Sequence, residues 1–255
     1  MKFYRFATEN KVRYGVIERD TMVEIEGNIF SQYTLADKRH KMNELTLLVP
    51  CKPSKIVAVG LNYRSHAKEL GMALPDEPLL FLKPSTSVVG PEEDIYYPPM
   101  SKRIDYEAEL AVVIGKKAKN IKENEAEGYI FGYTCMNDVT ARDLQKKDIQ
   151  FTRSKSFDTF TPIGPCIETD LDPDTAQVAS YLNGELRQRG NTRDLVFPVA
   201  RLVSFISQVM TLLPGDMIAT GTPVGVGPMA VGDTIEIVVE GIGTLRNRIV
   251  GQQIV

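Results

Sequence analysis

The sequence predicts an α+β fold in which β-strands dominate, and three observations support this prediction. Short runs of alternating or branched apolar residues recur from one end of the chain to the other. Proline and glycine residues separate these runs, as is typical of turns between strands. Only one longer segment, residues 198–213, repeats its apolar residues at helical spacing, through Leu202, Phe205, Ile206, Val209 and Leu213.

The composition is that of a globular protein of 255 residues, enough for one large domain or for a domain with a small addition. The net charge is -3 with acidic and basic residues interspersed, which argues against a general nucleic-acid or membrane surface. The cysteines, Cys51, Cys135 and Cys166, are widely spaced, so we expect reduced thiols in a cytoplasmic protein. The N-terminus lacks the apolar run of a signal peptide, and no stretch is long enough for a transmembrane helix.

Residues 1–52 are expected to form a small β-rich module ahead of the larger domain at residues 53–255, with prolines at the boundary. The first three runs of this module alternate apolar and polar residues: KFYRFAT, RYGVIE and TMVEIEG. The following segment, residues 35–50, fits either a helix or an irregular connection. His40 lies in a charged run of this segment, which we interpret as solvated and without a functional role.

A buried strand at residues 55–60 leads into a short helix at residues 61–71, which Gly71 ends. On that helix His66 and Glu69 are three residues apart and share a face. A carboxylate beside an imidazole can orient the ring and raise its basicity, so His66 is the better candidate base of the two histidines. The alternative is an ordinary surface helix with an incidental pair.

Residues 104–115 are predicted to form one apolar strand that a glycine ends, after a short strand at residues 81–84. Because side chains alternate along a strand, Glu107 and Glu109 point the same way, about 7 Å apart. Buried together, the two carboxylates would repel each other, and a bound cation would relieve that cost. Removal of Glu107 would then stabilise the metal-free protein. The alternative is a solvated strand edge.

Residues 123–128 fit a solvated helical turn, and residues 129–136 fit a second buried strand. Asp138 follows this strand, where an acid can cap a helix or bind a metal. The strongly polar residues 146–156 are expected to form a mobile loop or lid, and residues 161–165 a turn-rich connector.

The C-terminal part of the chain is predicted to return to strands. Asn183-Gly184 marks a β-hairpin, and a strand at residues 217–220 precedes a glycine-rich loop at residues 221–227. This loop lacks the lysine of a phosphate-binding Walker loop, although its glycines allow close approach to a ligand. Two final strands follow, around Gly232-Asp233 and residues 241–243.

The three carboxylates of Glu107, Glu109 and Asp138 together provide oxygen ligands for a hard cation such as magnesium, manganese or calcium. Zinc is less suited, because no histidine or cysteine cluster accompanies them. Such an ion could chelate a keto acid and stabilise its enolate as a Lewis acid. The side chains of Arg142, Gln145 and Lys155 could bind the oxygens of the substrate.

These residues resemble the fumarylacetoacetate hydrolase family, from about Lys55 to Arg246. Each segment alone is a weak signal, but together they are specific. The segments are 59–63 with His66, 81–84, 105–110, 137–145, 155–158 and 221–227. The short chain, which lacks the long N-terminal domain of fumarylacetoacetate hydrolase itself, is similar to the acylpyruvase and oxaloacetate decarboxylase branch of the family.

The resemblance implies a mixed β-sandwich roll, a homodimer and a metal held by Glu107, Glu109 and Asp138. The ion would be Mg²⁺ or Mn²⁺, with Ca²⁺ as a substitute in crystals. The resemblance also implies roles for the surrounding side chains. His66 and Glu69 would form a water-activating dyad on a segment that orders over substrate, Lys155 would stabilise the enolate or carboxylate, Thr222 would hold the substrate carboxylate, and Arg142 and Gln145 would contact substrate.

The sequence therefore predicts a metal-dependent hydrolase that cleaves a C–C bond in acylpyruvate-type diketo acids and that could also decarboxylate oxaloacetate. Two alternatives stay open. One is a decarboxylase, isomerase or hydratase of 2-oxo dioic acids from aromatic degradation. The other is a non-catalytic module that binds a metal and a small acid, although such a binder needs no water-activating dyad.

Overall fold

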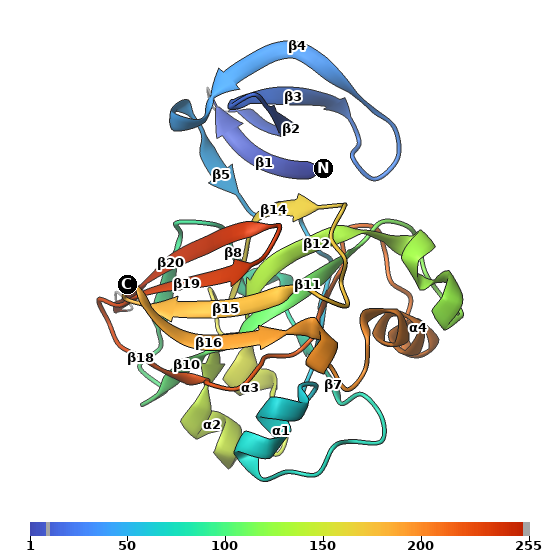
Figure 1. The fold of residues 1–255 in the computed structure, drawn as a ribbon. Helices are drawn as coiled ribbons and strands as arrows, with labels where there is room; N and C mark the ends of the chain where they lie inside the picture. Colours follow the sequence, from blue (N-terminus) through green and yellow to red (C-terminus); the bar gives the residue numbers. More distant parts are fainter. Residues whose placement is uncertain (9–10, 252–255) are drawn as a thin grey trace.

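The computed structural model describes residues 1–8 and 11–251, and strands dominate it, as the sequence predicts (Figure 1). The N-terminal strands form the upper part of Figure 1: β1 (Lys2–Thr8), β2 (Lys11–Glu18), β3 (Thr21–Gly27), β4 (Tyr33–Lys41) and β5 (Thr46–Leu48). A 3₁₀ turn, η1 (Met42–Glu44), separates β4 from β5. The prediction of a helix or an irregular connection at residues 35–50 is therefore wrong, because β4 pairs with β3.

His40 lies on β4 and is buried, so its interpretation as part of a solvated charged run is wrong. The side chain is 8% exposed, and Nε2 lies 2.7 Å from Oε1 of Glu24 on the neighbouring strand. The imidazole also packs edge-on against the ring of Phe6. The run was misjudged because alternate residues of a strand face opposite sides, so one member of a charged run can point inward.

A large mixed sheet runs through the molecule in the order β4-β3-β2-β1-β14-β12-β11-β17-β6-β7. Its members beyond the N-terminal strands are β6 (Ile56–Val59), β7 (Leu80–Lys83), β11 (Ala108–Ile114), β12 (Ile130–Asn137), β14 (Thr161–Glu168) and β17 (Met217–Ala219). The N-terminal strands join this sheet where β1 pairs with β14. The short β5 pairs with β1, and β8 (Val88–Val89) pairs with β14. Residues 161–165, predicted as a connector, instead begin β14, because their backbone pairs with β8 and β12.

The described residues also form two smaller sheets. A five-stranded sheet has the order β16-β15-β19-β20-β9, with β9 (Asp94–Tyr97), β15 (Gln177–Leu182), β16 (Glu185–Asn191), β19 (Thr234–Val239) and β20 (Gly243–Gly251). Its β15–β16 hairpin turns at Asn183-Gly184 with positive φ at both residues, which confirms the predicted hairpin. A three-stranded sheet contains β10 (Ile104–Tyr106), β13 (Thr140–Ala141) and β18 (Gly227–Met229).

The single strand predicted at residues 104–115 is in fact two strands that belong to different sheets. The break falls at Glu107, between β10 in the three-stranded sheet and β11 in the large sheet. The amide of Glu107 donates to Oδ1 of Asn137, and the Glu107 carbonyl accepts from the amide of Asp138. These bonds tie the break to the end of β12. Alternate side chains still share a face across it, because Tyr106, Ala108 and Leu110 pack in one apolar cluster and the carboxylates of Glu107 and Glu109 meet.

In the part of the chain that the structure describes, four α-helices and three further 3₁₀ turns connect the strands. They are α1 (Arg64–Leu70), α2 (Arg142–Lys147), α3 (Thr152–Lys155), α4 (Val199–Val209), η2 (Ser85–Ser87), η3 (Glu123–Tyr129) and η4 (Thr192–Asp194). Gly71 ends α1 with a φ of 65°, as predicted. The polar residues 146–156, expected to form a loop, include the end of α2 and all of α3. In Figure 1, α1, α2 and α3 lie at the end of the molecule opposite the N-terminal strands.

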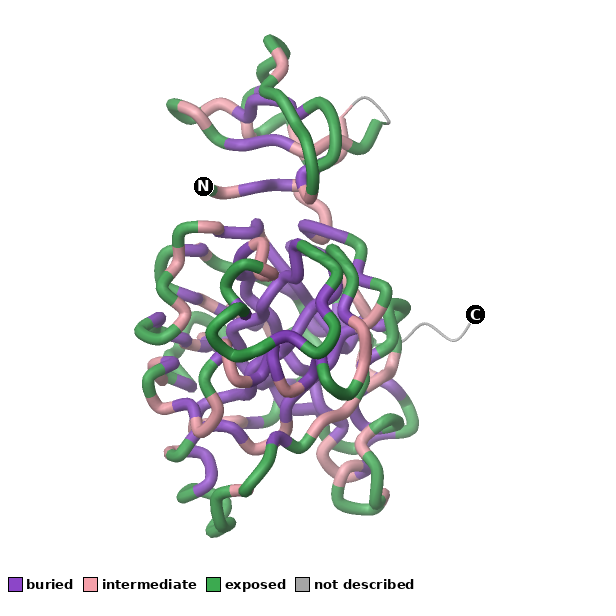
Figure 2. The backbone as a smooth tube through the Cα atoms, turned by 90° about the vertical axis from the view of Figure 1, so that its right-hand side faces the viewer, coloured by how far each residue is buried: buried purple, intermediate pink, exposed green. Residues whose placement is uncertain are grey.

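The strand β11 lies at the centre of the core, and both of its faces are buried. Leu110, Val112 and Ile114 belong to one apolar cluster, and Ala111 and Val113 belong to another. Figure 2 shows buried residues concentrated in the interior of the lower part of the molecule. Glu109 lies near the start of this buried strand, so its carboxylate is fixed in the protein interior.

Two observations bear on the surroundings of the protein. The three cysteines are free and buried, which agrees with the expected reduced thiols. Among residues 1–8 and 11–251, no helix is long and apolar enough to cross a membrane.

Candidate active site

The carboxylates of Glu107, Glu109 and Asp138 meet at one place inside the protein. One oxygen of each lies within 4.8 Å of the other two, and all three residues are buried. Glu107 comes from the break between β10 and β11, Glu109 from β11, and Asp138 from the residue after β12. We call these three residues the acidic cluster. Since β11 and β12 are paired neighbours, the fold itself holds the cluster together.

Two buried lysines contact the acidic cluster. Nζ of Lys155 lies 2.8 Å from Oε2 of Glu107 and 2.5 Å from Oδ2 of Asp138. Nζ of Lys83 lies 2.5 Å from Oδ1 of Asp138 and also donates to the backbone carbonyl of Lys155. Lys83 was missed as a site residue. The available signal was a lysine at the end of an apolar strand, a position where a charged side chain needs a buried partner.

Arg142 supports the cluster from α2. Its guanidinium donates to Oδ2 of Asp105 at 2.8 Å, to Oε1 of Glu107 at 2.5 Å and to Oε1 of Gln145 at 2.6 Å. Although burial acts in the opposite direction, Glu107 and Asp105 raise the pKa of Arg142. Arg142 and Gln145 therefore lie at the site together, and Arg142 neutralises part of the negative charge of the acidic cluster.

Charge is distributed unevenly over the acidic cluster. Burial favours the neutral form of Glu107, but Lys155 and Arg142 outweigh it and lower the pKa of Glu107 to about 2. Burial, together with the carboxylates of Asp138 and Glu107, raises the pKa of Glu109. The like-charge repulsion predicted from the sequence therefore acts on Glu109. Removal of Glu107 would relieve part of this repulsion but would also break the ion pairs of Glu107 with Lys155 and Arg142, so we expect a net loss of stability in place of the gain expected from the sequence.

His66 and Glu69 form the predicted pair on α1. Nδ1 of His66 lies 2.8 Å from Oε2 of Glu69, and the imidazole is largely buried. Glu69 also accepts from the amide of Gly225 at 3.2 Å, which links the pair to the glycine-rich loop. With Nδ1 engaged by the carboxylate, Nε2 of His66 is the nitrogen left for a ligand.

A cavity of about 270 Å³ collects most of the predicted site residues. Its polar lining comprises His66, Glu107, Glu109, Arg142, Gln145, Lys146, Lys155 and Thr222. Apolar side chains, among them Leu79, Phe81 and Phe151, line the rest. Asp138 and Glu69 do not line the cavity. Asp138 contacts Lys155, and Glu69 contacts His66, and both of these partners line the cavity.

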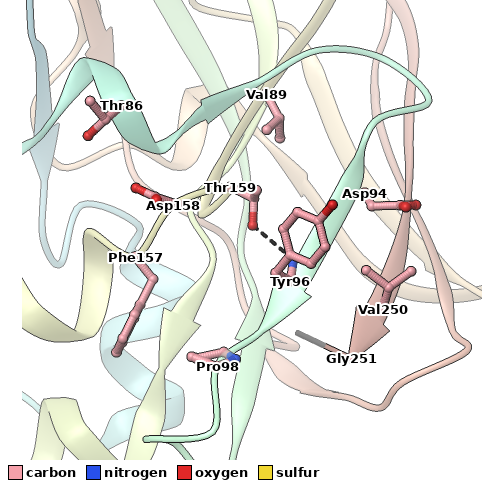
Figure 3. Close-up of a pocket in the computed structure, with 10 residues that line it drawn as sticks. All are labelled: Thr86, Val89, Asp94, Tyr96, Pro98, Phe157, Asp158, Thr159, Val250 and Gly251. Carbon is pink, nitrogen blue, oxygen red and sulfur yellow. Dashed lines mark hydrogen bonds between the residues drawn. The ribbon is translucent and has the colours of Figure 1, made fainter. Parts of the chain in front are cut away.

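A second cavity, of about 760 Å³, lies between β9, β20 and the segment 157–159 (Figure 3). None of the predicted site residues lines it. Its two acids, Asp94 and Asp158, are exposed and lie on opposite sides of the hollow in Figure 3. Because catalytic sites need charged groups that converge, the smaller cavity is the candidate active site.

The chain matches two family descriptions. "Fumarylacetoacetate (FAA) hydrolase C-terminal" covers residues 55–250, and "Rv2993c-like, N-terminal" covers residues 1–50. Among curated proteins, the human oxaloacetate tautomerase FAHD2A, mitochondrial, is 41% identical over 221 residues. The match spans 82% of this chain and 70% of that protein.

Solved structures show the same fold. A 5-carboxymethyl-2-hydroxymuconate delta-isomerase from Mycobacterium smegmatis superposes with a TM-score of 0.93 at 43% identity, over 99% of this chain and 100% of that one. A maleylpyruvate hydrolase from Sphingobium sp. SYK-6, in complex with manganese(II) and pyruvate, has a TM-score of 0.82 at 31% identity, with coverage of 99% and 100%. The predicted mostly β fold of this type is therefore confirmed.

Proposed function

This chain belongs to the fumarylacetoacetate hydrolase family, and we propose that it is a divalent-metal-dependent hydrolase that cleaves a C–C bond of acylpyruvate-type keto acids. One observation carries the proposal. The acidic cluster, the Lys155 ammonium and the His66–Glu69 pair converge on a single cavity. A cation site, a substrate-binding cation and an oriented base are the three parts that this reaction needs.

The acidic cluster suits a hard divalent cation such as Mg²⁺ or Mn²⁺, because all its donors are carboxylate oxygens. Glu109 forms no ion pair among the described residues, and its burial beside the other two carboxylates is a cost that a bound cation would relieve. Glu107, Glu109 and Asp138 would hold the ion. When bound, the ion would supply Lewis-acid stabilisation of a pyruvate enolate. The manganese and pyruvate in the maleylpyruvate hydrolase relative support this proposal.

Lys155 would bind the keto acid beside the cluster. Its ammonium is held by Glu107 and Asp138 and lies over the ring of Phe81, 5.3 Å from the centroid. Although it is buried, Asp138 and Glu107 raise the pKa of Lys155, so the side chain stays charged. A charged donor at this position stabilises negative charge on the substrate carboxylate or on the enolate oxygen.

His66 would remove a proton from the attacking water. Glu69 holds Nδ1, so Nε2 is the nitrogen that accepts the proton. The water oxygen adds to the distal carbonyl carbon, and the adjacent C–C bond then breaks. The products are a carboxylic acid and the enolate of pyruvate, which His66 can reprotonate to give pyruvate.

A second candidate function is keto–enol or double-bond isomerisation of a 2-oxo dioic acid, with decarboxylation of oxaloacetate as a related reaction. The likenesses to an oxaloacetate tautomerase and to a 5-carboxymethyl-2-hydroxymuconate delta-isomerase favour it. These reactions need the same enolate stabilisation but no attack by water. In the tautomerase reaction, His66 would move a proton between carbon and oxygen.

Product analysis distinguishes the two candidates. The purified protein would be given Mg²⁺ or Mn²⁺ with acetylpyruvate or with oxaloacetate. Pyruvate and acetate from acetylpyruvate support the hydrolase, and chelation with EDTA should abolish their release. Loss of the enol absorbance of oxaloacetate without pyruvate release supports the tautomerase. No reaction with either substrate in the presence of metal would contradict the hydrolase and the tautomerase, and would favour a double-bond isomerase or the non-catalytic binding module.

We also propose that the protein is a homodimer in the cytoplasm. The family resemblance supports the dimer, and the free buried cysteines agree with a reducing compartment. Sedimentation equilibrium of the purified chain tests the oligomeric state, and a monomer across the micromolar range would contradict it.

A further inference from the structure

Gln188 on β16 makes four hydrogen bonds and is almost completely buried. Its Oε1 accepts from the amide of Ala108 and from the hydroxyl of Ser180, each at 3.0 Å. Its Nε2 donates to the hydroxyl of Thr222 and to the carbonyl of Pro223, each at 2.8 Å. One side chain therefore joins β11, β15 and the glycine-rich loop of the active site.

These partners determine which end of the Gln188 amide faces which neighbour. The amide of Ala108 can only donate, and the carbonyl of Pro223 can only accept, so Oε1 faces Ala108 and Nε2 faces the loop. The hydroxyl of Thr222 must then accept from Nε2. Its single proton goes to the carbonyl of Ala108 at 2.9 Å. The hydroxyl has no proton left to donate to a substrate.

Among the described residues, the backbone of the loop leaves the amide of Thr222 free beside the cavity. The amide of Gly221 donates to Oε2 of Glu109 at 2.8 Å. Within residues 1–8 and 11–251, the next amide, that of Thr222, donates to no acceptor, although Thr222 lines the cavity. Farther along the loop, the amide of Gly225 donates to Glu69. Between these two anchors, Gln188 fixes the loop at Thr222 and Pro223.

We infer that Gln188 is a positioning residue for the substrate. Through Thr222 and Pro223 it holds the loop so that the Thr222 backbone amide, and not the hydroxyl, donates to the carboxylate of the 2-oxo acid. This inference rests on the proposed function and deepens it, because it names the donor that recognises the carboxylate. It keeps the role that the family resemblance implies for Thr222 and assigns that role to the backbone amide.

Oxalate, a small dianion that resembles the enolate of pyruvate, is a suitable probe in the presence of Mn²⁺. Gln188→Met keeps the side-chain length but removes all four hydrogen bonds. We expect it to weaken oxalate binding by about 5- to 30-fold, the effect of one or two lost hydrogen bonds. KM for the 2-oxo acid should rise with little change in kcat, because the carboxylate contact is present in both ground and transition states. Mn²⁺ affinity should not change, since none of the acidic cluster is altered.

Two further variants complete the test. Thr222→Val removes the hydroxyl but keeps the amide and the Gln188–Pro223 bond, so it should weaken oxalate binding less than Gln188→Met does. Gln177→Met, on the exposed face of neighbouring β15, is the control and should bind as the wild type does. Titration calorimetry of Mn²⁺, then of oxalate, gives both affinities.

The outcomes separate this inference from the proposed function. Unchanged oxalate binding in Gln188→Met would overturn the inference. So would a larger loss in Thr222→Val, which would make the hydroxyl the donor. If Gln188→Met loses Mn²⁺ binding together with oxalate binding, the residue has a merely structural role and the inference is overturned. Failure of the wild-type protein to bind Mn²⁺ and oxalate would overturn the proposed function, and the inference with it.

Discussion

The ammonium nitrogen of Lys155 lies 2.5 Å from Oδ2 of Asp138, so a cation of the chain itself contacts the acidic cluster. The same nitrogen contacts Glu107, whereas Glu109 has no ion pair among the described residues. Any divalent ion at the cluster would lie close to this ammonium. Lys155 should therefore affect metal affinity as well as substrate binding.

Replacement of Lys155 by methionine should tighten Mn²⁺ binding by at least about tenfold. The reason is that removal of a positive charge a few ångströms from the ion relieves more than about 1.4 kcal/mol of repulsion in a partly buried site. Titration calorimetry measures the affinity. Turnover should fall at the same time, because the cation that faces the substrate is lost.

Lys146→Met is the matched control for this prediction. Lys146 lines the same cavity and carries the same charge, but it is exposed and does not contact the cluster. Its replacement should change Mn²⁺ affinity much less. Equal affinities of Lys155→Met and the wild type would show that the ammonium does not oppose the ion.

Glu109→Gln should stabilise the metal-free protein at neutral pH by about 1–3 kcal/mol, within the usual range of single substitutions. Burial and the nearby carboxylates raise the pKa of Glu109. A carboxyl with a raised pKa contributes stability below its unfolded pKa, and this contribution is lost as the pH rises through the folded pKa. Thermal unfolding in EDTA measures the effect, which should shrink in mildly acidic buffer. A variant less stable than the wild type at neutral pH would contradict the prediction.

Glu107→Gln should have the opposite effect, a loss of about 3 kcal/mol at neutral pH. Burial opposes ionisation of Glu107, but Lys155 and Arg142 lower its pKa to about 2. Its stabilising contribution is therefore present above the ordinary pKa of a glutamate and is lost only as the pH falls toward 2. Urea unfolding of both variants in EDTA compares them directly. Equal effects of the two substitutions would contradict the uneven charge distribution.

His66→Ala should slow acylpyruvate hydrolysis by about 10²–10⁴-fold, the contribution of a general base. Decarboxylation of oxaloacetate should suffer less, because carbon dioxide leaves without attack by water. Asp138→Ala should abolish both reactions. The measurement is kcat for each variant on both substrates. Lys68→Ala, exposed on the same helix, is the control. Near-normal hydrolysis by His66→Ala would show that His66 is not the general base.

The sequence was sufficient to predict the parts of the site that depend on local pattern. The positions of Glu107, Glu109 and Asp138 next to apolar strands indicated a cation site, and the spacing of His66 and Glu69 indicated their pair. The structure brings each of these sets together. The mostly β fold followed from short apolar runs in the same way.

The features that could not be predicted depend on contacts between distant segments. The break at Glu107 results from hydrogen bonds to Asn137 and Asp138, which are about thirty residues away in the chain. Lys83 and Gln188 are polar residues in strands, and only the folded chain shows that they are buried against the site. The burial of His40 was missed for the same reason. The division into domains at residue 52 stays a prediction.

The most direct test of the account is the anomalous diffraction of a crystal soaked in Mn²⁺. The account predicts one strong peak within about 2.3 Å of a carboxylate oxygen from each of Glu107, Glu109 and Asp138, as expected for first-row divalent ions and oxygen ligands. A fully loaded crystal with no peak at the acidic cluster, or with manganese bound only elsewhere, would contradict the metal site and the enzyme mechanism built on it.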